Sequence, residues 1–419
     1  MSITPTPSID WRPEDPAVRA DPFPTFARLR DEDPCHWHPR LRSWVLTRYD
    51  DVKAVCLDRE RVSSDRLRPF FRAMPGPEAE RIADIVRYLS LWMVFKDPPE
   101  HTRLRRLASK VFTVKSMQGM RGKAAELSQW LLDRVDGRDE IDLIADFAGP
   151  LPCLVIMEML GVPREHLAHV KRLSDEIAQF IGSARTQAEK YDTAQAATRE
   201  LAAFFGEMIA ERRREPRDDA ISGLIRVGDH DDGDGDGDGD GFDDDELVAT
   251  CILMLFAGHE TTTNHIANGM LALMRFPGEM ARLRADPSLA PRAVEELLRY
   301  DGPSGAQVRI VVEPHALHGR TLEPGQRVFL MLNAANRDPR AYADPDRVEL
   351  MREGPPHLAF GFGMHICLGF PLARTEGEVA LPALLARYRS IEPTTDGYDW
   401  LDSLVFRGVR SLPVRVARA

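Results

Sequence analysis

A cysteine near the end of a glycine-rich run is the first candidate for chemistry in this sequence. Residues 360–369 read Phe-Gly-Phe-Gly-Met-His-Ile-Cys-Leu-Gly, and they place Cys367 just before a predicted helix over 368–385. Glycines allow tight turns and close backbone approach, and the N–H groups and dipole at a helix start favour a thiolate. A thiolate can hold a haem iron that cleaves an O–O bond. A buried, inert cysteine is the alternative interpretation.

A long helix is predicted over residues 243–276, just before Pro277. Asp243 and Glu246 have the spacing of a capping box at its start. Residues 247–257 are apolar on nearly every side, so this half of the helix is expected to be buried all round.

The same helix turns polar abruptly at residues 258–265, which begin Gly-His-Glu-Thr-Thr. Ala257 and Gly258 are small enough for a ligand to approach the helix. A hydroxyl on Thr261 can bond the carbonyl of Ala257, four residues back, and open the helix locally. This pattern predicts a ligand-binding notch. A set of polar groups satisfied within a large core is the alternative.

A third pattern is Glu296-Leu-Leu-Arg299. Glutamate and arginine three residues apart share a helix face and can pair. Taken alone, such a pair is more typical of an ordinary surface salt bridge.

Together the three patterns resemble the signature motifs of the cytochrome P450 family, in the order and spacing that the family requires. Residues 360–369 resemble its haem-binding loop, 257–262 its oxygen-binding helix, and Glu296 with Arg299 its buried structural pair. The resemblance covers nearly the whole chain. It implies that Arg337, and Arg347 or Arg352, are the residues available to complete the buried pair.

The resemblance implies haem b (iron protoporphyrin IX) as the cofactor and Cys367 as the ligand of its iron. His101, Arg105, Arg309 and His365 match positions that bind the haem propionates. The full set of implied cofactor-binding residues is His101, Arg105, Ala257, Gly258, Arg309, Phe360, His365, Cys367 and Gly369.

The implied reaction is insertion of an oxygen atom from molecular oxygen, by hydroxylation or epoxidation. Glu260 and Thr261 resemble the family's acid–alcohol pair, which delivers protons. No flavin or nicotinamide motif was found, so a separate ferredoxin and ferredoxin reductase are expected as electron donors. Arg103, Arg106 and Lys110 are candidates for a basic docking patch, or equally for a solvated helix face.

The expected substrate is a small or medium apolar molecule, such as a terpenoid, fatty acid, polyketide or aromatic compound. The family positions for substrate contact are Phe95, Phe180, Phe256, Ser304, Gln307, Val405 and Phe406. Two other functions stay open: a peroxide-driven peroxygenase, which would not need Glu260 and Thr261, and a non-enzymatic haem sensor, which would need no electron donor.

Helices must supply most of the framework that positions these residues. Helical patterns extend over 100–112, 116–135 and 193–214 in addition to those above, whereas strand patterns are short, at 43–47, 307–312, 327–332 and 412–416. The sequence therefore predicts a mainly α protein with small β-sheets. The resemblance implies the triangular-prism fold of the family in a single domain over residues 1–419.

The charge of the chain is concentrated in one segment. Residues 229–246 hold eleven acidic side chains and no lysine or arginine, which matches the formal net charge of −11 for the whole chain. Residues 228–242 alternate Asp and Gly, and this composition predicts a flexible, solvated loop rather than a calcium site. With the charge elsewhere balanced, neither a nucleic-acid partner nor a membrane is expected.

The five cysteines are scattered and odd in number, which argues against a disulfide framework and against a CxxC zinc site. The polar, proline-rich first residues contain no apolar run of the kind found in signal peptides. A cytoplasmic monomer is expected.

Overall fold

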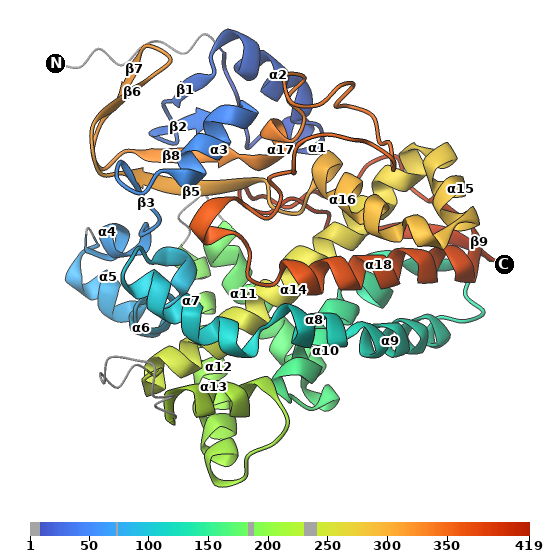
Figure 1. Ribbon diagram of the computed structural model, residues 1–419, viewed down its shortest axis with the longest axis horizontal. Helices are drawn as coiled ribbons and strands as arrows, with labels where there is room; N and C mark the ends of the chain where they lie inside the picture. The colour runs from blue at the N-terminus through green and yellow to red at the C-terminus, as the bar shows by residue number, and fades with distance from the viewer. Residues whose placement is uncertain (1–8, 73, 183–187, 230–240) are drawn as a thin grey trace.

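The computed structural model describes residues 9–72, 74–182, 188–229 and 241–419. Most of the segment predicted as a flexible acidic loop, residues 230–240, lies outside this part of the chain. Figure 1 shows a broadly triangular body, with the larger sheet beside the N-terminus and helices filling the rest. Within the described ranges, no helix is both long and apolar enough to cross a membrane.

Helices make up most of the molecule. In chain order they are α1 (Pro16–Ala20), α2 (Phe23–Glu32), α3 (Tyr49–Leu57), α4 (Leu67–Arg72), α5 (Gly76–Arg81), α6 (Ala83–Leu89), α7 (Glu100–Val111), α8 (Val114–Gly119), α9 (Arg121–Arg134), α10 (Pro150–Leu160), α11 (Leu167–Gly182), α12 (Ala188–Arg214), α13 (Ala220–Asp229), α14 (Asp244–Arg275), α15 (Pro277–Ala285), α16 (Ala290–Asp301), α17 (Leu332–Ala335) and α18 (Phe370–Arg387). Short 3₁₀ turns lie at η1 (Met93–Phe95), η3 (Arg164–His166), η4 (Pro287–Leu289) and η5 (Gly363–His365), and η2 (Ile144–Ala148) is a π-helical turn.

The strands are β1 (Cys35–His38), β2 (Ser43–Leu46), β3 (Val62–Ser63), β4 (Glu140–Asp142), β5 (Ala306–Val311), β6 (His315–Leu317), β7 (Arg320–Leu322), β8 (Arg327–Met331), β9 (Tyr388–Pro393) and β10 (Pro413–Arg418). The larger sheet has the order β1-β2-β8-β5-β3, a smaller sheet has the order β4-β10-β9, and β6 pairs with β7. Strand β2 runs parallel to β8, so the sheet joins segments that are far apart in the sequence.

The predicted helices are largely confirmed, with one correction. The helix expected over 116–135 is two helices, α8 and α9, which meet at Met120. Gly119 and Gly122 flank the break, and glycine is a poor helix former. Thr113 and Ser116 form a capping box that begins α8 earlier than expected.

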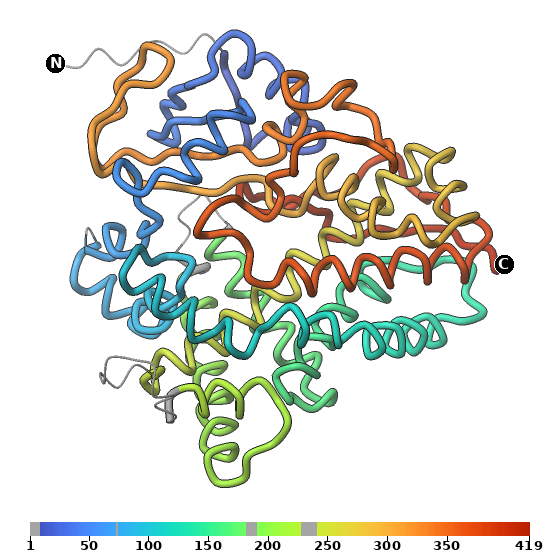
Figure 2. The backbone as a smooth tube through the Cα atoms, in the orientation of Figure 1, coloured from blue at the N-terminus to red at the C-terminus, as the bar shows by residue number. Residues whose placement is uncertain are grey.

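Helix α14 crosses the middle of the molecule, as Figure 2 shows in yellow. Its 32 residues span about 48 Å at 1.5 Å per residue. The predicted capping box is present, because the Asp243 side chain accepts from the N–H of Glu246 and the Glu246 side chain accepts from that of Asp243. The helix packs against α10, α16 and α18, which explains its all-round burial and places its polar middle inside the protein.

Candidate functional site

The loop before α18 has the tight backbone that its glycines predict. Gly361 and Gly363 have positive φ angles of 71° and 72°. A Cβ at Gly363 would lie 2.9 Å from the carbonyl oxygen of Cys56, and one at Gly361 would overlap the side chain of Gln307. The N–H of Cys367 donates to the carbonyl of Phe360 at 2.9 Å. These contacts hold Cys367 at the end of a closed turn.

The side chain of Cys367 opens into a cavity. Burial raises the pKa of its thiol, while backbone N–H groups of Gly369 and Phe370 and the charge of Arg105 act to lower it. The N–H groups at the helix start thus act in the direction that the sequence indicated, and desolvation opposes them. A bound metal cation would supply the positive charge that holds the thiolate.

The cavity has a volume of about 240 Å³ and lies between α14 and the Cys367 loop. The predicted site residues that line it are His101, Arg105, Ala257, Gly258, Thr261, Ser304, Gln307, Phe360, His365, Cys367 and Gly369. The other predicted positions, Glu260, Arg309, Phe95, Phe180, Phe256, Val405 and Phe406, are not among the described residues that line it.

Three of the four side chains predicted to hold propionates, His101, Arg105 and His365, line this cavity, and the charge of Arg309 acts on both histidines. The rings of His101 and His365 lie 4.2 Å apart between their centroids. Burial, helped by the charges of nearby arginines, lowers the pKa of His101 to about 4 and that of His365 to about 3. Arg309 contributes to both shifts, and Arg105 donates to the carbonyl of Ile366 at 2.8 Å.

These residues fit the haem that the resemblance implies. His101 Nδ1 and His365 Nε2 are buried without a hydrogen-bond partner among the described residues. Buried polar atoms normally have partners, and the two carboxylates of a haem would supply them. Gly369 also lines the cavity beside Cys367.

The hydrogen bond predicted in the middle of α14 is present. Thr261 Oγ1 donates to the carbonyl of Ala257 at 3.1 Å, and Thr262 Oγ1 donates to that of Gly258 at 3.3 Å. Gly258 has a further role that the sequence did not indicate, because a Cβ there would lie 2.9 Å from Ile156 of α10. The missing side chain allows the two helices to pack closely.

Glu260 lies beside two side chains that sequence reasoning did not select, Asp175 and His259. Candidate ligand atoms of the three residues all lie within 4.8 Å of one another. His259 is 1% exposed, and its Nε2 lies 3.3 Å from Asp175 Oδ1. Burial raises the pKa of Glu260, and the charge of Asp175 adds to this effect while His259 opposes it. A proton held on Glu260 is therefore favoured.

Asp175 connects this cluster with solvent. Its side chain is 41% exposed, and Lys171 Nζ lies 2.7 Å from its Oδ2. Burial would raise the pKa of Asp175, but the hydrogen bond from His259 and the charge of Lys171 hold it below its ordinary value. The position of His259 directly before Glu260 in the sequence was the signal that could have identified it.

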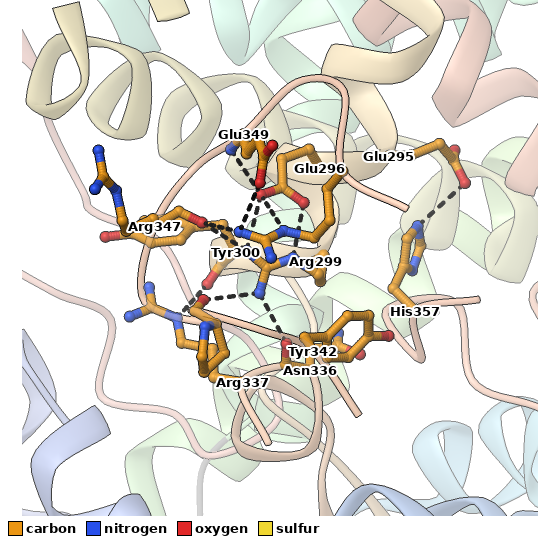
Figure 3. Close-up of polar contacts among 12 residues, drawn as sticks. Glu295, Glu296, Arg299, Tyr300, Asn336, Arg337, Tyr342, Arg347, Glu349 and His357 are labelled. Atoms are coloured by element: carbon orange, nitrogen blue, oxygen red, sulfur yellow. Dashed lines mark hydrogen bonds and ion pairs between the residues drawn. The ribbon is translucent and has the colours of Figure 1, made fainter. Parts of the chain in front are cut away.

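The pair of Glu296 and Arg299 is buried, as the resemblance implies. Arg299 Nε lies 2.7 Å from Glu296 Oε2, and both side chains are less than 5% exposed. Figure 3 shows Arg299 surrounded by polar groups of the following loop, including the carbonyls of Asn336 and Arg347 at 3.0 and 2.9 Å. It also donates to the carbonyl of Pro345 at 2.8 Å.

The structure decides which arginine completes the pair. Arg352 Nε donates to Glu296 Oε1 at 3.0 Å, whereas Arg347 contributes its carbonyl oxygen to Arg299. Arg337 instead donates to the carbonyl of Tyr300 at 2.7 Å. The backbone turns between residues 338 and 352 determine which arginine reaches Glu296. The spacing of the arginines in the sequence was not sufficient to predict this.

Several predicted substrate residues belong to an aromatic row beside the cavity. Phe95 stacks on Trp92 with 6.1 Å between ring centroids, and Trp92 stacks on Phe256 at 5.3 Å. Phe256 meets the edge of Phe406 at 6.0 Å. Phe180 contacts Tyr191 instead, at 5.7 Å. The row, defined here as Phe95, Trp92, Phe256 and Phe406, forms a rigid apolar wall behind the residues that line the cavity.

One of the three basic residues considered for a docking patch on α7 is engaged within the protein. Arg103 donates to the carbonyl of Gly241 at 2.9 Å and pairs with Glu246. Its guanidinium therefore ties α7 to the start of α14. Whether Arg103 also contributes with Arg106 and Lys110 to a docking patch stays a prediction, with the solvated helix face as the equal alternative.

His265 is a cavity residue that sequence reasoning missed, although it lies one helical turn after Thr261. Its Nε2 is buried without a partner among the described residues. Burial, with a smaller effect from His357, lowers the pKa of His265 to about 4.

We expect His265 to make the protein less stable in acid. As the pH falls from about 6.5 towards about 4, His265 binds a proton in the unfolded chain but stays neutral in the folded chain. The free energy of unfolding therefore decreases. His265→Asn should lessen this dependence by up to about 1.4 kcal/mol per pH unit. Urea unfolding of the purified protein at several pH values measures it. His315→Asn is the control, and equal slopes for wild type and His265→Asn would contradict the prediction.

Comparisons with known proteins agree with this geometry. Residues 36–406 match the family model described as Cytochrome P450. The chain is 37% identical to 6-deoxyerythronolide B hydroxylase of Saccharopolyspora erythraea, over 96% of this chain and 98% of that protein. It is 37% identical to the cytochrome P450 monooxygenase PikC of Streptomyces venezuelae, over 95% and 92%.

Solved structures agree as well. The crystal structure of CalO2 matches with a TM-score of 0.87 and 31% identity, over 97% of this chain and 99% of that one. That of P450BioI, in complex with a hexadec-9Z-enoic acid ligated acyl carrier protein, matches with a TM-score of 0.86 and 32% identity, over 96% and 99%. The mainly helical fold expected from the sequence is confirmed. With the Cys367 loop, the Thr261 hydrogen bond in α14 and the buried pair of Glu296 and Arg299 all in place, this chain belongs to the cytochrome P450 family, whose cofactor is haem.

Proposed function

We propose that this protein is a monooxygenase that binds haem through Cys367 and inserts one atom of molecular oxygen into an apolar organic substrate. Hydroxylation of a C–H bond and epoxidation of a double bond are the reactions proposed. The observation that carries this proposal is that Cys367 and Thr261 face the same cavity from opposite elements. When bound, the haem supplies the iron at which oxygen is activated.

The residues of the chain have distinct roles in this proposal. Cys367 donates electron density to the iron, and His101, Arg105, Arg309 and His365 hold the propionates. Thr261 presents its hydroxyl to the cavity while it donates to the carbonyl of Ala257.

Protons reach the site through Glu260. The raised pKa of this carboxyl favours a form that can donate, and general acids work best when their pKa approaches the working pH. Asp175 and His259 connect Glu260 with solvent, because Asp175 is partly exposed and lies 3.3 Å from His259. Thr261 would then pass the proton into the cavity.

The proposed electron donors are a separate ferredoxin and ferredoxin reductase. For the substrate, the apolar lining of the cavity, which includes Met93, Val94 and Leu253, supports a small or medium molecule with a large apolar body. The relatives include a hydroxylase named for 6-deoxyerythronolide B, so polyketides belong to the proposed range.

Thr261→Ala is expected to uncouple the enzyme rather than unfold it. Without the hydroxyl, proton delivery loses its control and reduced oxygen leaves as hydrogen peroxide. Product formed per nicotinamide oxidised should fall by about tenfold or more, while haem content and substrate affinity stay near those of the wild type. Product, peroxide and nicotinamide are measured together in a reconstituted ferredoxin system.

Thr250→Ala, a buried threonine of α14 outside the cavity, is the matched control. Unchanged coupling in Thr261→Ala would contradict the proposed role. The measurement is repeated with a substrate analogue that has no hydroxyl or amine groups, so that the substrate itself cannot replace the missing hydroxyl. Turnover driven by peroxide alone would favour a peroxygenase. Haem binding without turnover by either route would favour a sensor.

A further inference from the structure

Among the described residues, the charge of Arg66 has no partner, in contrast to those of its neighbours Arg61 and Arg68. Arg66 lies in the short link between β3 and α4. Arg61 pairs with Asp58 at 2.6 Å, and Arg68 pairs with Asp65 at 3.2 Å. Among the residues that the structure describes, the side chain of Arg66 has neither a hydrogen bond nor an ion pair, and its contact is the ring of Phe95.

The surroundings of Arg66 are unusually positive. Burial, followed by the charges of Arg309 and Arg327, lowers the pKa of Arg66 to about 10, so it remains a cation at neutral pH. Arg309 donates to the carbonyl of Val308 and to Gln307, and neither Arg309 nor Arg327 forms an ion pair with a described carboxylate. A half-buried cation near two others is costly unless an anion is bound.

The position of Arg66 connects it with the substrate cavity. Its guanidinium carbon lies 4.9 Å from the centroid of Phe95, the outer end of the aromatic row. Phe95 closes the turn whose other residues, Met93 and Val94, line the cavity. Arg66 is not itself among the described residues that line the cavity, but a ligand whose apolar body lies against Met93 and Val94 would have its end one residue away from the ring that Arg66 contacts.

We propose that Arg66 binds the carboxylate of an amphiphilic substrate whose apolar part extends into the haem cavity. This inference rests on the proposed function and names the class of its substrate: an apolar acid, such as a medium- or long-chain fatty acid. Arginine suits this task because its planar guanidinium can donate two parallel hydrogen bonds to a carboxylate. The ring of Phe95 holds the guanidinium in place by stacking.

The haem propionates are the competing anions, and the distribution of donors argues against them. A haem carries two propionates, and His101, Arg105, Arg309 and His365 already converge where these carboxylates would lie. Arg66 is an additional cation, and it stacks on the aromatic row rather than joining the two imidazoles. It is therefore available to a second ligand.

The test is an optical titration of the full-length haem-loaded protein, in which the ferric spin state reports substrate binding. The probes are straight-chain saturated fatty acids of 8 to 16 carbons and the methyl ester of each acid. The variants are Arg66→Gln, the charge-conserving Arg66→Lys, and Arg68→Gln as a control for an exposed, paired arginine of the same region. Haem content is measured for each.

We expect at least one acid to bind the wild type about tenfold or more tightly than its ester. Arg66→Gln should remove this preference while leaving ester affinity and haem content unchanged. Arg66→Lys should retain part of it, and Arg68→Gln all of it.

Two results would overturn the proposal. One is that no acid binds more tightly than its ester, or that the preference survives in Arg66→Gln. The other is that Arg66→Gln loses haem and binds acids and esters equally weakly, which would assign Arg66 to a propionate. Failure of the proposed function is separate: acids would then bind in an Arg66-dependent way while no ferredoxin system supports turnover.

Discussion

Cys367→His abolishes the strongly red-shifted Soret band of the reduced carbon monoxide complex, and with it oxygen insertion, while haem can remain bound. An imidazole is a neutral donor and lacks the electron density that a thiolate supplies to the iron. The loop should tolerate the change in part, because the Cys367 side chain faces an open cavity rather than packed neighbours. The spectrum of the reduced carbonyl complex and the haem content measure both effects.

The other cysteines serve as controls. Burial raises the pKa of Cys35, Cys153 and Cys251 to about 12, so none of them is suited to be a thiolate. Cys56→Ala is the closest control, since the Cys56 carbonyl touches the ligand loop at Gly363. It should keep the red-shifted band. Retention of that band in Cys367→His would show that another residue is the ligand.

Arg299→Leu is expected to lower the free energy of unfolding by about 3 to 5 kcal/mol, because it leaves the buried carboxylate of Glu296 with less compensation. The same change removes the donor for three carbonyls of the following loop. This loop leads into the residues before Cys367, so poor haem retention should accompany the loss of stability. Urea unfolding and haem content of the purified variant measure the two effects.

Arg292→Ala tests whether the effect depends on burial. Arg292 is an exposed residue of the same helix, α16, and its loss should change stability by no more than about 0.5 kcal/mol. If Arg299→Leu were as mild as this control, the buried cluster around Glu296 would not be a determinant of stability.

Much of the framework could be predicted because local rules agree with it. The capping box at Asp243, the apolar half of α14 and the Thr261 hydrogen bond depend on residues within four positions of one another. Helix propensity and spacing are sufficient for such features. The same holds for the tight turns at Gly361 and Gly363.

The features that were missed depend on segments that meet only in the folded chain. Arg352 completes the Glu296 pair because a long turn returns it to α16. Arg103 contacts Gly241 and Glu246 across about a third of the sequence. The lone charge of Arg66 is visible only when all its neighbours are known. The thiol of Cys367 shows the same limit, since the desolvation that opposes its helix-start N–H groups comes from segments distant in the sequence.

The parallel pairing of β2 with β8 has a consequence for how the protein is made. Trp44 of β2 donates a hydrogen bond to Gln326, which lies 282 residues later in the chain. Arg105 donates to the carbonyl of Ile366, which lies 261 residues after it. At a synthesis rate of 5 to 20 residues per second, the first strands leave the ribosome roughly 15 to 60 s before their partner exists. During this time β1 and β2 form an unprotected hairpin edge that can pair with other chains. Because the haem cradle also needs both ends of the polypeptide, cofactor capture is a late event, and slower translation should increase the demand for chaperones.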